Sequence, residues 1–231
     1  MSIAEKLTTI AENEQKVYEA GKTAEWNEFW DEFQQKGQRT MYNGAFNNGG
    51  WTKKNFKPKY DFKIKDGCYQ MFANSMYEVD LAEILSKNGV KFDYTGATDL
   101  NGMFHSCLTN HLPEIGNENI TNATSLFSVA WLVTTIDKLT LAPNCSMSQA
   151  FFRCDALQNI TIGNTISCNG WEFPHSKLLT HDSLMNIINK LEDKSEDTSG
   201  TVWKIAFGSE NLSKLTDGEK EIVFKKGWIL S

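Results

Sequence analysis

Apolar residues recur in three consecutive segments of the chain, at residues 97–115, 123–141 and 145–162. In each segment one apolar residue opens the unit, an apolar pair follows, and another apolar residue comes next. The aligned positions are Leu100, Leu126 and Met147, then Met103–Phe104, Val129–Ala130 and Ala150–Phe151, then Cys107, Val133 and Cys154. A period of about 21–26 residues is typical of leucine-rich repeats, whose units stack because one unit cannot bury its apolar side alone.

The second and third segments also agree at their ends. There the aligned residues are Val133, Ile136, Leu139 and Leu141 against Cys154, Leu157, Ile160 and Ile162. The Leu-x-Leu and Ile-x-Ile triplets predict short strands with alternate side chains pointing inward. Stacking would make these strands parallel neighbours, so the pattern predicts an α+β repeat solenoid in which Leu139–Leu141 lies beside Ile160–Ile162.

The residues between the inward positions should form a polar outer face of this predicted sheet. They are Glu114, Lys138, Thr140, Asn159 and Thr161. Such a face is the natural docking surface of a solenoid. Threonine and asparagine also suit any solvated strand, so a purely structural interpretation of these residues stays open.

Residues 1–36 predict one long helix. Its first part spaces apolar or small residues by three and four positions, at Ile3, Leu7, Ile10, Val17, Gly21 and Ala24. This spacing favours a coiled coil that joins copies of the chain, with a trimer favoured and with Ile3, Leu7, Ile10, Val17 and Ala24 as the oligomerisation residues. Glu14 and Gly21 weaken that seam, and a helix that only caps the solenoid is the alternative.

Residues 37–67 form a connecting region that precedes the repeats at 68–173. Lysines such as Lys53, Lys57 and Lys63 alternate with aromatic residues there, a mixture found in grooves for single-stranded nucleic acid. An edge strand with lysines on its wet face is the favoured interpretation. Weaker repeat units are expected around residues 68–85 and 166–173.

Residues 174–231 break the repeat and predict an α/β cap for its last unit. Apolar residues at helical spacing follow Thr180, which is expected to cap the helix. The segment 201–207 alternates like a strand, with Trp203, Ile205 and Phe207 on one side. A short helix and a final strand at 228–230 complete the prediction.

The composition is that of a folded protein, and its net charge does not favour binding to polyanions such as nucleic acids. Hydrophobic residues make up 40% of the 231 residues, charged residues 23%, and the net charge is −6. We therefore expect no nucleic-acid partner, and no apolar run approaches the ~20 residues of a membrane span. The N-terminal residues lack the basic and apolar parts of a signal peptide, so a cytoplasmic protein is expected when it is made.

No constellation of residues predicts catalysis, a metal or a cofactor. The five cysteines form no Cys-x-x-Cys pair and are expected to be buried free thiols. His105 and His111 lie near Cys107, but their spacing fits no zinc motif. Paired carboxylates such as Glu192 and Asp193 fall in a polar turn. We therefore do not expect an enzyme.

The units running from Met103 to Cys107 and from Phe151 to Cys154 resemble the BspA-like leucine-rich repeats of bacterial surface proteins. The leader and the tail of the chain are similar to a subgroup encoded in prophages of gut Firmicutes. The second unit departs from this pattern, with Ala130 and Val133 in place of phenylalanine and cysteine. The resemblance implies adhesion and a place on a virion, near the tail tip or baseplate, and brings no catalytic residues.

Two functions follow from these observations. The leading hypothesis is a non-enzymatic recognition or adhesion protein, associated with a phage or prophage tail, that binds a cell-surface glycan or protein. The alternative is an intracellular interaction module, such as a phage-encoded inhibitor of a host or defence factor. A glycan hydrolase is a third and less favoured hypothesis, because it needs a facing carboxylate pair in a cleft.

Overall fold

The computed structural model describes residues 58, 61–64, 66–73 and 79–231. The predicted helix at 1–36 lies outside these residues, and so do its oligomerisation positions Ile3, Leu7, Ile10, Val17 and Ala24. Most of the basic segment at 53–65 lies outside them as well. In the described part, no helix is both long enough and apolar enough to cross a membrane.

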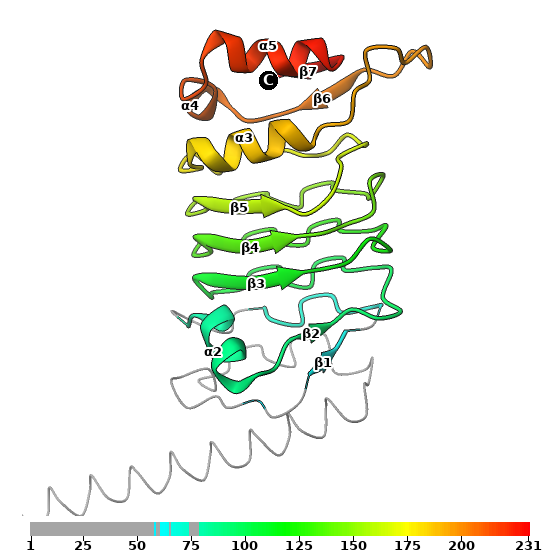
Figure 1. The fold of residues 1–231 in the computed structure, drawn as a ribbon. Coiled ribbons are helices and arrows are strands. Elements are labelled where there is room, and N and C mark those ends of the chain that lie inside the picture. The colour runs from blue at the N-terminus through cyan, green and yellow to red at the C-terminus, as the bar shows by residue number, and fades with distance from the viewer. Residues whose placement is uncertain (1–57, 59–60, 65, 74–78) are drawn as a thin grey trace, which may run out of the picture.

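The described chain climbs in successive turns that stack into a column (Figure 1). Its helices are α2 (Leu81–Asn88), α3 (His181–Lys190), α4 (Ser209–Leu212) and α5 (Asp217–Lys225). Its strands are β1 (Phe62–Lys63), β2 (Phe92–Asp93), β3 (His111–Ile115), β4 (Thr135–Leu139), β5 (Asn159–Ile162), β6 (Trp203–Ile205) and β7 (Trp228–Leu230).

The central sheet contains β3, β4 and β5 in the order of the sequence, and every pair is parallel. Two rows of apolar residues run across it into the core, the first made of Leu112, Ile136 and Ile160, the second of Ile115, Leu139 and Ile162. Parallel β1 and β2 precede this sheet, and parallel β6 and β7 follow it.

A helix closes each edge of the central sheet. At the first edge, Asp80 just before α2 makes a parallel bridge to His111 of β3. At the other edge, α3 supplies side-chain acceptors: the amide of Ile160 donates to Ser183 Oγ at 3.0 Å, and the amide of Ile162 donates to an Asn186 side-chain oxygen at 2.7 Å. These contacts satisfy backbone groups that an open edge would leave free for another strand.

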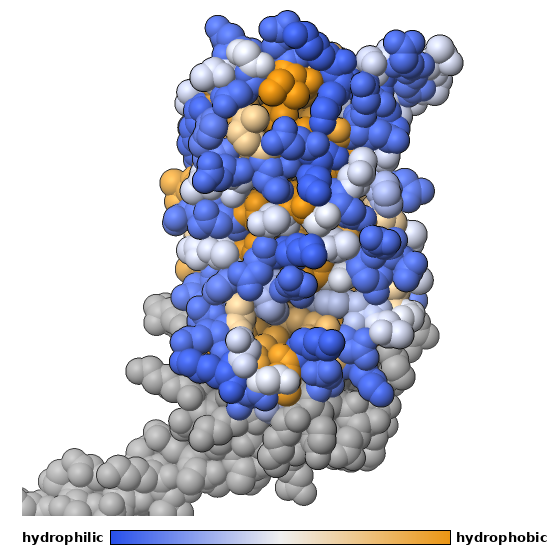
Figure 2. All heavy atoms as spheres, in the orientation of Figure 1, coloured by the Kyte–Doolittle hydropathy of each residue, from blue (hydrophilic) through white to orange (hydrophobic). Residues whose placement is uncertain are grey.

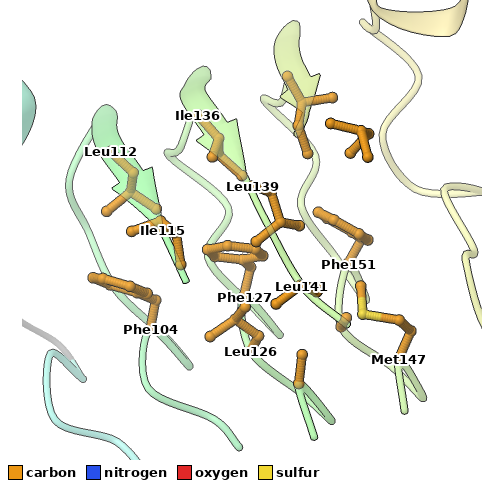
Figure 3. Close-up of a cluster of buried hydrophobic side chains, with 14 of the residues drawn as sticks. Phe104, Leu112, Ile115, Leu126, Phe127, Ile136, Leu139, Leu141, Met147 and Phe151 are labelled. Carbon is orange, nitrogen blue, oxygen red and sulfur yellow. The ribbon is translucent and has the colours of Figure 1, made fainter. Parts of the chain in front are cut away.

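A column of buried phenylalanines runs through the core behind the sheet. Its members are Phe72, Phe104, Phe127, Phe151, Phe173 and Phe207. Successive ring centroids lie 4.5 to 6.0 Å apart, the range of favourable aromatic pairs. Figure 3 shows three of these rings, Phe104, Phe127 and Phe151, facing the apolar side chains of β3 and β4. Each turn of the column therefore contributes one ring to a continuous stack.

This column corrects the predicted alignment of the second unit, which was wrong by three residues. Phe127 stacks between Phe104 and Phe151, so the second unit does contain its phenylalanine. Ala130 then takes the place of the repeated cysteine, and Ala123 the place predicted for Leu126. The shift arose because Leu126 was matched to Leu100, whereas in the structure Leu126 corresponds to Met103 and precedes Phe127 as Met103 precedes Phe104.

The predicted register of the strands was wrong as well. The structure pairs Ile136 with Ile160 and Leu139 with Ile162, whereas the sequence alignment placed Leu139 opposite Ile160. The strand β4 ends at Leu139, so the Leu139–Leu141 triplet is only its end and the buried turn beyond. The register also shifts between Ile136 and Leu139, which is a β-bulge.

The turns behind the core repeat an unusual backbone conformation. Gly102, Ser125 and Gln149 have φ of 59°, 53° and 56°, and a second set four residues later repeats it. That second set is Ser106, Val129 and Arg153, with φ of 58°, 62° and 55°. Side chains make this left-handed region costly. Backbone bonds between successive turns offset the cost, such as the one that the Val129 amide donates to the Phe152 carbonyl at 2.7 Å.

After Phe173 only Phe207 continues the aromatic column, and the other main contacts of this region are not repeated. Thr180 caps α3 by accepting a hydrogen bond from the Ser183 amide, which confirms the predicted cap. The predicted alternation around β6 is also confirmed, since Ile205 and Phe207 are buried while Lys204 is exposed.

The ammonium group of Lys226 closes the C-terminal end of α3. It donates to the carbonyls of Ile188, Asn189 and Leu191 at 3.2, 3.0 and 2.7 Å. A helix end has carbonyls without helical partners, and the lysine supplies donors for them.

Candidate binding face

The outward-facing side chains of β3, β4 and β5, together with Thr140 beside them, form one surface, which we call the outer sheet face. All five predicted binding residues belong to it. Glu114, Asn159 and Thr161 are exposed, and Lys138 and Thr140 are half-buried. The register places Glu114 directly opposite Lys138. Thr140 lies just beyond β4, where its amide donates to the Ile115 carbonyl at 2.9 Å. The structure therefore brings the predicted residues together on one side of the sheet.

Three further residues of the outer sheet face were missed by the sequence analysis, namely His111, Thr135 and Asp137. Two residues of β4, Asp137 and Lys138, stand opposite the single residue Thr161 because of the bulge. A bulge re-aims side chains, and here it leaves Asp137 exposed. Strict alternation of inward and outward positions could not have identified Asp137, because the bulge interrupts that alternation.

His111 contacts two carboxylates of neighbouring elements through its two ring nitrogens. Its Nδ1 lies 3.1 Å from Asp80 Oδ2, and its Nε2 lies 2.6 Å from Asp137 Oδ1. Partial burial lowers the pKa of His111, but the hydrogen bonds to Asp137 and Asp80 and their negative charges outweigh it, so the pKa lies above its usual value. The protonated imidazole donates to both carboxylates, whereas a neutral imidazole has only one N–H.

Asp80 links this histidine to the helix beside the sheet. One of its carboxylate oxygens contacts His111, and the other accepts the Glu83 amide at 2.7 Å as the N-cap of α2. A single carboxylate therefore fixes both the start of α2 and the orientation of the His111 ring. The consequence is a chain of contacts from α2 through β3 to β4.

The other edge of the outer sheet face, at β5, is connected to the helix α3 in a similar way. Thr135 stands opposite Asn159 in the register, and the Thr180 hydroxyl donates to Asn159 Oδ1 at 3.3 Å. Thr180 is also the N-cap of α3. Figure 2 shows this side of the molecule as mainly hydrophilic, with smaller apolar areas between the polar groups. The surface is thus a flat array of polar groups held by its register and its flanking helices.

The structure does not bring His105, His111 and Cys107 into a metal site. The His105 ring nitrogen Nδ1 lies 2.8 Å from the Ser106 hydroxyl, while His111 contacts the two carboxylates. Within the residues that the structure describes, no group of three or more histidine, cysteine, aspartate or glutamate side chains could hold a metal ion.

All five cysteines are free thiols; Cys68, Cys107, Cys145 and Cys154 are buried as expected, whereas Cys168 is half-buried. Burial raises the pKa of Cys68, Cys107 and Cys145 to about 12, and it raises the pKa of Cys154 further. The thiolate is the reactive form, so these side chains stay protonated and unreactive at neutral pH. Cys154 Sγ instead lies 3.1 Å from the Phe127 carbonyl, as a packed core group.

Comparisons of the chain with protein-family models, with curated proteins and with solved structures find no match.

Proposed function

We propose that this chain is a non-enzymatic recognition protein of the leucine-rich-repeat solenoid class, and that its partner docks on the outer sheet face. The observation that carries the proposal is the parallel register of β3, β4 and β5, which holds a flat row of polar groups in fixed positions. Binding surfaces gain affinity when their groups are ordered before the partner arrives.

Two features favour binding over catalysis. The carboxylates nearest the histidine, Asp80 and Asp137, are both occupied by it. The core thiols are protonated, because burial raises their pKa. These two carboxylates and these core thiols therefore serve contacts within the protein.

The resemblance to BspA-like repeats supports the more specific part of the proposal. By this analogy the chain is an adhesin on a phage or prophage tail, and its partner is a glycan or protein on the bacterial surface. The coiled-coil spacing at residues 3–24 supports a trimer, as expected for a fibre component. Light scattering of the full chain tests this point, since a strict monomer at micromolar concentration would contradict the fibre.

Binding of the fluorescently labelled chain to intact gut Firmicutes cells tests the docking face. Thr161→Arg places a long side chain on β5, beside the central strand of the outer sheet face, where Thr161 is exposed and the added bulk would hold a partner away from the sheet. Ser148→Arg makes the same kind of change in an exposed turn behind the core. We expect Thr161→Arg to weaken binding at least tenfold and Ser148→Arg to leave it unchanged. The reverse result would place the docking surface elsewhere.

An intracellular interaction module is the second candidate, favoured by the free thiols, since disulfides are rare in reducing compartments. Pull-down from a host lysate separates the two functions. A stoichiometric protein partner that is lost with Thr161→Arg supports the intracellular module, and cell binding without such a partner supports the adhesin.

A further inference from the structure

Two lysines, Lys138 of β4 and Lys190 of α3, lie beside one glycine, Gly163, just after β5. Lys138 leaves the bulge of β4 so that its Cε lies 3.0 Å from the point where a Cβ of Gly163 would stand. Lys190, the last residue of α3, donates from Nζ to the Gly163 carbonyl at 3.4 Å. A strand and a helix that are far apart in the sequence, β4 and α3, thus bring two positive charges to the same turn.

The glycine is required for this arrangement. A Cβ at position 163 would overlap the Thr140 hydroxyl and press on the Lys138 side chain. Neighbouring Asn164 fixes the turn, because its side-chain oxygen accepts the Leu141 amide at 3.3 Å and its side-chain nitrogen donates to the Leu141 carbonyl. The turn therefore provides a bare backbone surface beside a hydroxyl group and two ammonium groups.

The two ammonium groups have donors left over. Lys138 and Lys190 form no ion pair within 4.0 Å with a carboxylate of the described residues. The contrast is with Lys177 and Lys225, which contact Glu210 at 2.7 Å and Glu221 at 3.1 Å. An ammonium group has three donors, and the one bond of Lys190 to Gly163 leaves two of them.

We propose that Lys138, Lys190 and Thr140 bind the carboxylate of an acidic sugar. Lysines act as point charges for such an anion, and the Thr140 hydroxyl supplies a further hydrogen bond. The uncharged polar groups Thr161 and Asn159 lie on the same face and suit the hydroxyl groups of a sugar ring better than a string of acidic side chains. This inference rests on the proposed function and names the chemistry of its partner.

The test measures binding of the full chain to three soluble probes by calorimetry at low salt. The probes are oligogalacturonate, which carries a carboxylate on each sugar, neutral dextran, and poly-L-glutamate, which is an acidic protein chain. We expect oligogalacturonate to bind and dextran not to bind. Poly-L-glutamate should bind at least tenfold more weakly than oligogalacturonate, and equal binding of the two would overturn the assignment to a sugar.

Substitutions then locate the site. Lys138→Gln and Lys190→Gln should each weaken oligogalacturonate binding about tenfold, the effect of losing one hydrogen bond to a charged group. Lys204→Gln is the matched control, because it removes one charge from an exposed position in β6. A loss of equal size in all three variants would show unspecific attraction and overturn the proposal. Circular dichroism of each variant checks that the fold is intact.

The two proposals fail in different ways. If the chain binds cells and loses this binding with Thr161→Arg, but ignores oligogalacturonate, the acidic-sugar site is wrong and the docking face stands. If oligogalacturonate binds through the two lysines while Thr161→Arg leaves cell binding unchanged, the sugar site stands and the docking face does not.

Discussion

The central turns and the C-terminal cap of this molecule are both held together by buried contacts, but the kinds of contact differ. Between β3 and β5 each turn repeats the contacts of its neighbour: one ring in the phenylalanine column, one strand in the sheet, and the same backbone bonds behind the core. In the cap Phe207 continues the phenylalanine column, but the contacts that close the end of the molecule occur once. Lys226 closes the end of α3, and Trp228 Nε1 donates to the Glu192 carbonyl at 2.8 Å.

This difference predicts how much of the molecule a destabilising substitution affects. A repeated contact is shared with turns on both sides, so a defect in the middle weakens two interfaces at once. A contact in the cap has no copies in neighbouring turns, so its loss destabilises only the C-terminal region. The predictions below test this contrast, in order of decreasing effect.

Phe127→Ala removes the middle ring of the aromatic column. Phe127 is fully buried between Phe104 and Phe151, so we expect the free energy of unfolding to fall by about 3–5 kcal/mol. Urea unfolding followed by circular dichroism measures this. Phe152→Ala is the control, since that ring is 42% exposed and its loss should cost much less. Similar losses for both would contradict the column as the main source of stability.

Lys226→Met removes the donors from the end of α3 while keeping the length of the side chain. The carbonyls of Ile188, Asn189 and Leu191 lose the ammonium donor, although Ile188 still accepts the Leu191 amide, and we expect the free energy of unfolding to fall by about 1–3 kcal/mol. Hydrogen exchange should show the loss in α3 and the cap, with the central turns still protected. Lys225→Met is the neighbouring control, whose exposed pair with Glu221 contributes little. Uniform loss of protection would show that cap and turns unfold together.

Val129→Asn should stabilise the protein. Val129 has φ of 62°, a region that is costly for a β-branched side chain and tolerated by asparagine. We expect a gain of about 0.5–1 kcal/mol in thermal or urea unfolding. Val202→Asn, at a position 62% exposed, is the control and should change stability little. A loss of stability at position 129 would mean that packing of the valine outweighs its backbone strain.

His111→Gln should change how stability depends on pH. The pKa of His111 is raised in the folded chain, so its contribution is complete below the unfolded pKa of about 6.5 and is lost as the pH rises through the folded value. The wild-type advantage over His111→Gln should therefore shrink as the pH rises above about 6.5 and through the raised pKa of the folded state. His105→Gln, which has the Ser106 hydroxyl as its neighbour, is the control. An advantage that grows with pH would contradict the two-carboxylate contact.

The sequence revealed the period of the units and the polarity of the outer sheet face, because both follow from residue type. It also located the cap of α3 at Thr180, since side-chain capping is a local property. It missed the alignment of Phe127 and the exposure of Asp137. Both depend on which residue of one turn lies above which residue of the next, and a bulge or a shift of three residues leaves the local apolar pattern nearly unchanged.

The two helices at the sheet edges determine how this architecture can change in length. Because α2 and α3 each finish one side, a new turn of 23 or 24 residues could enter between β3 and β5 without disturbing either closure, as the spacing of Phe104, Phe127 and Phe151 indicates. Growth from either extremity would first have to remove a helix. The central sheet is in this sense extendable from within and closed at both of its edges, so its outer face could lengthen by duplication of an inner turn.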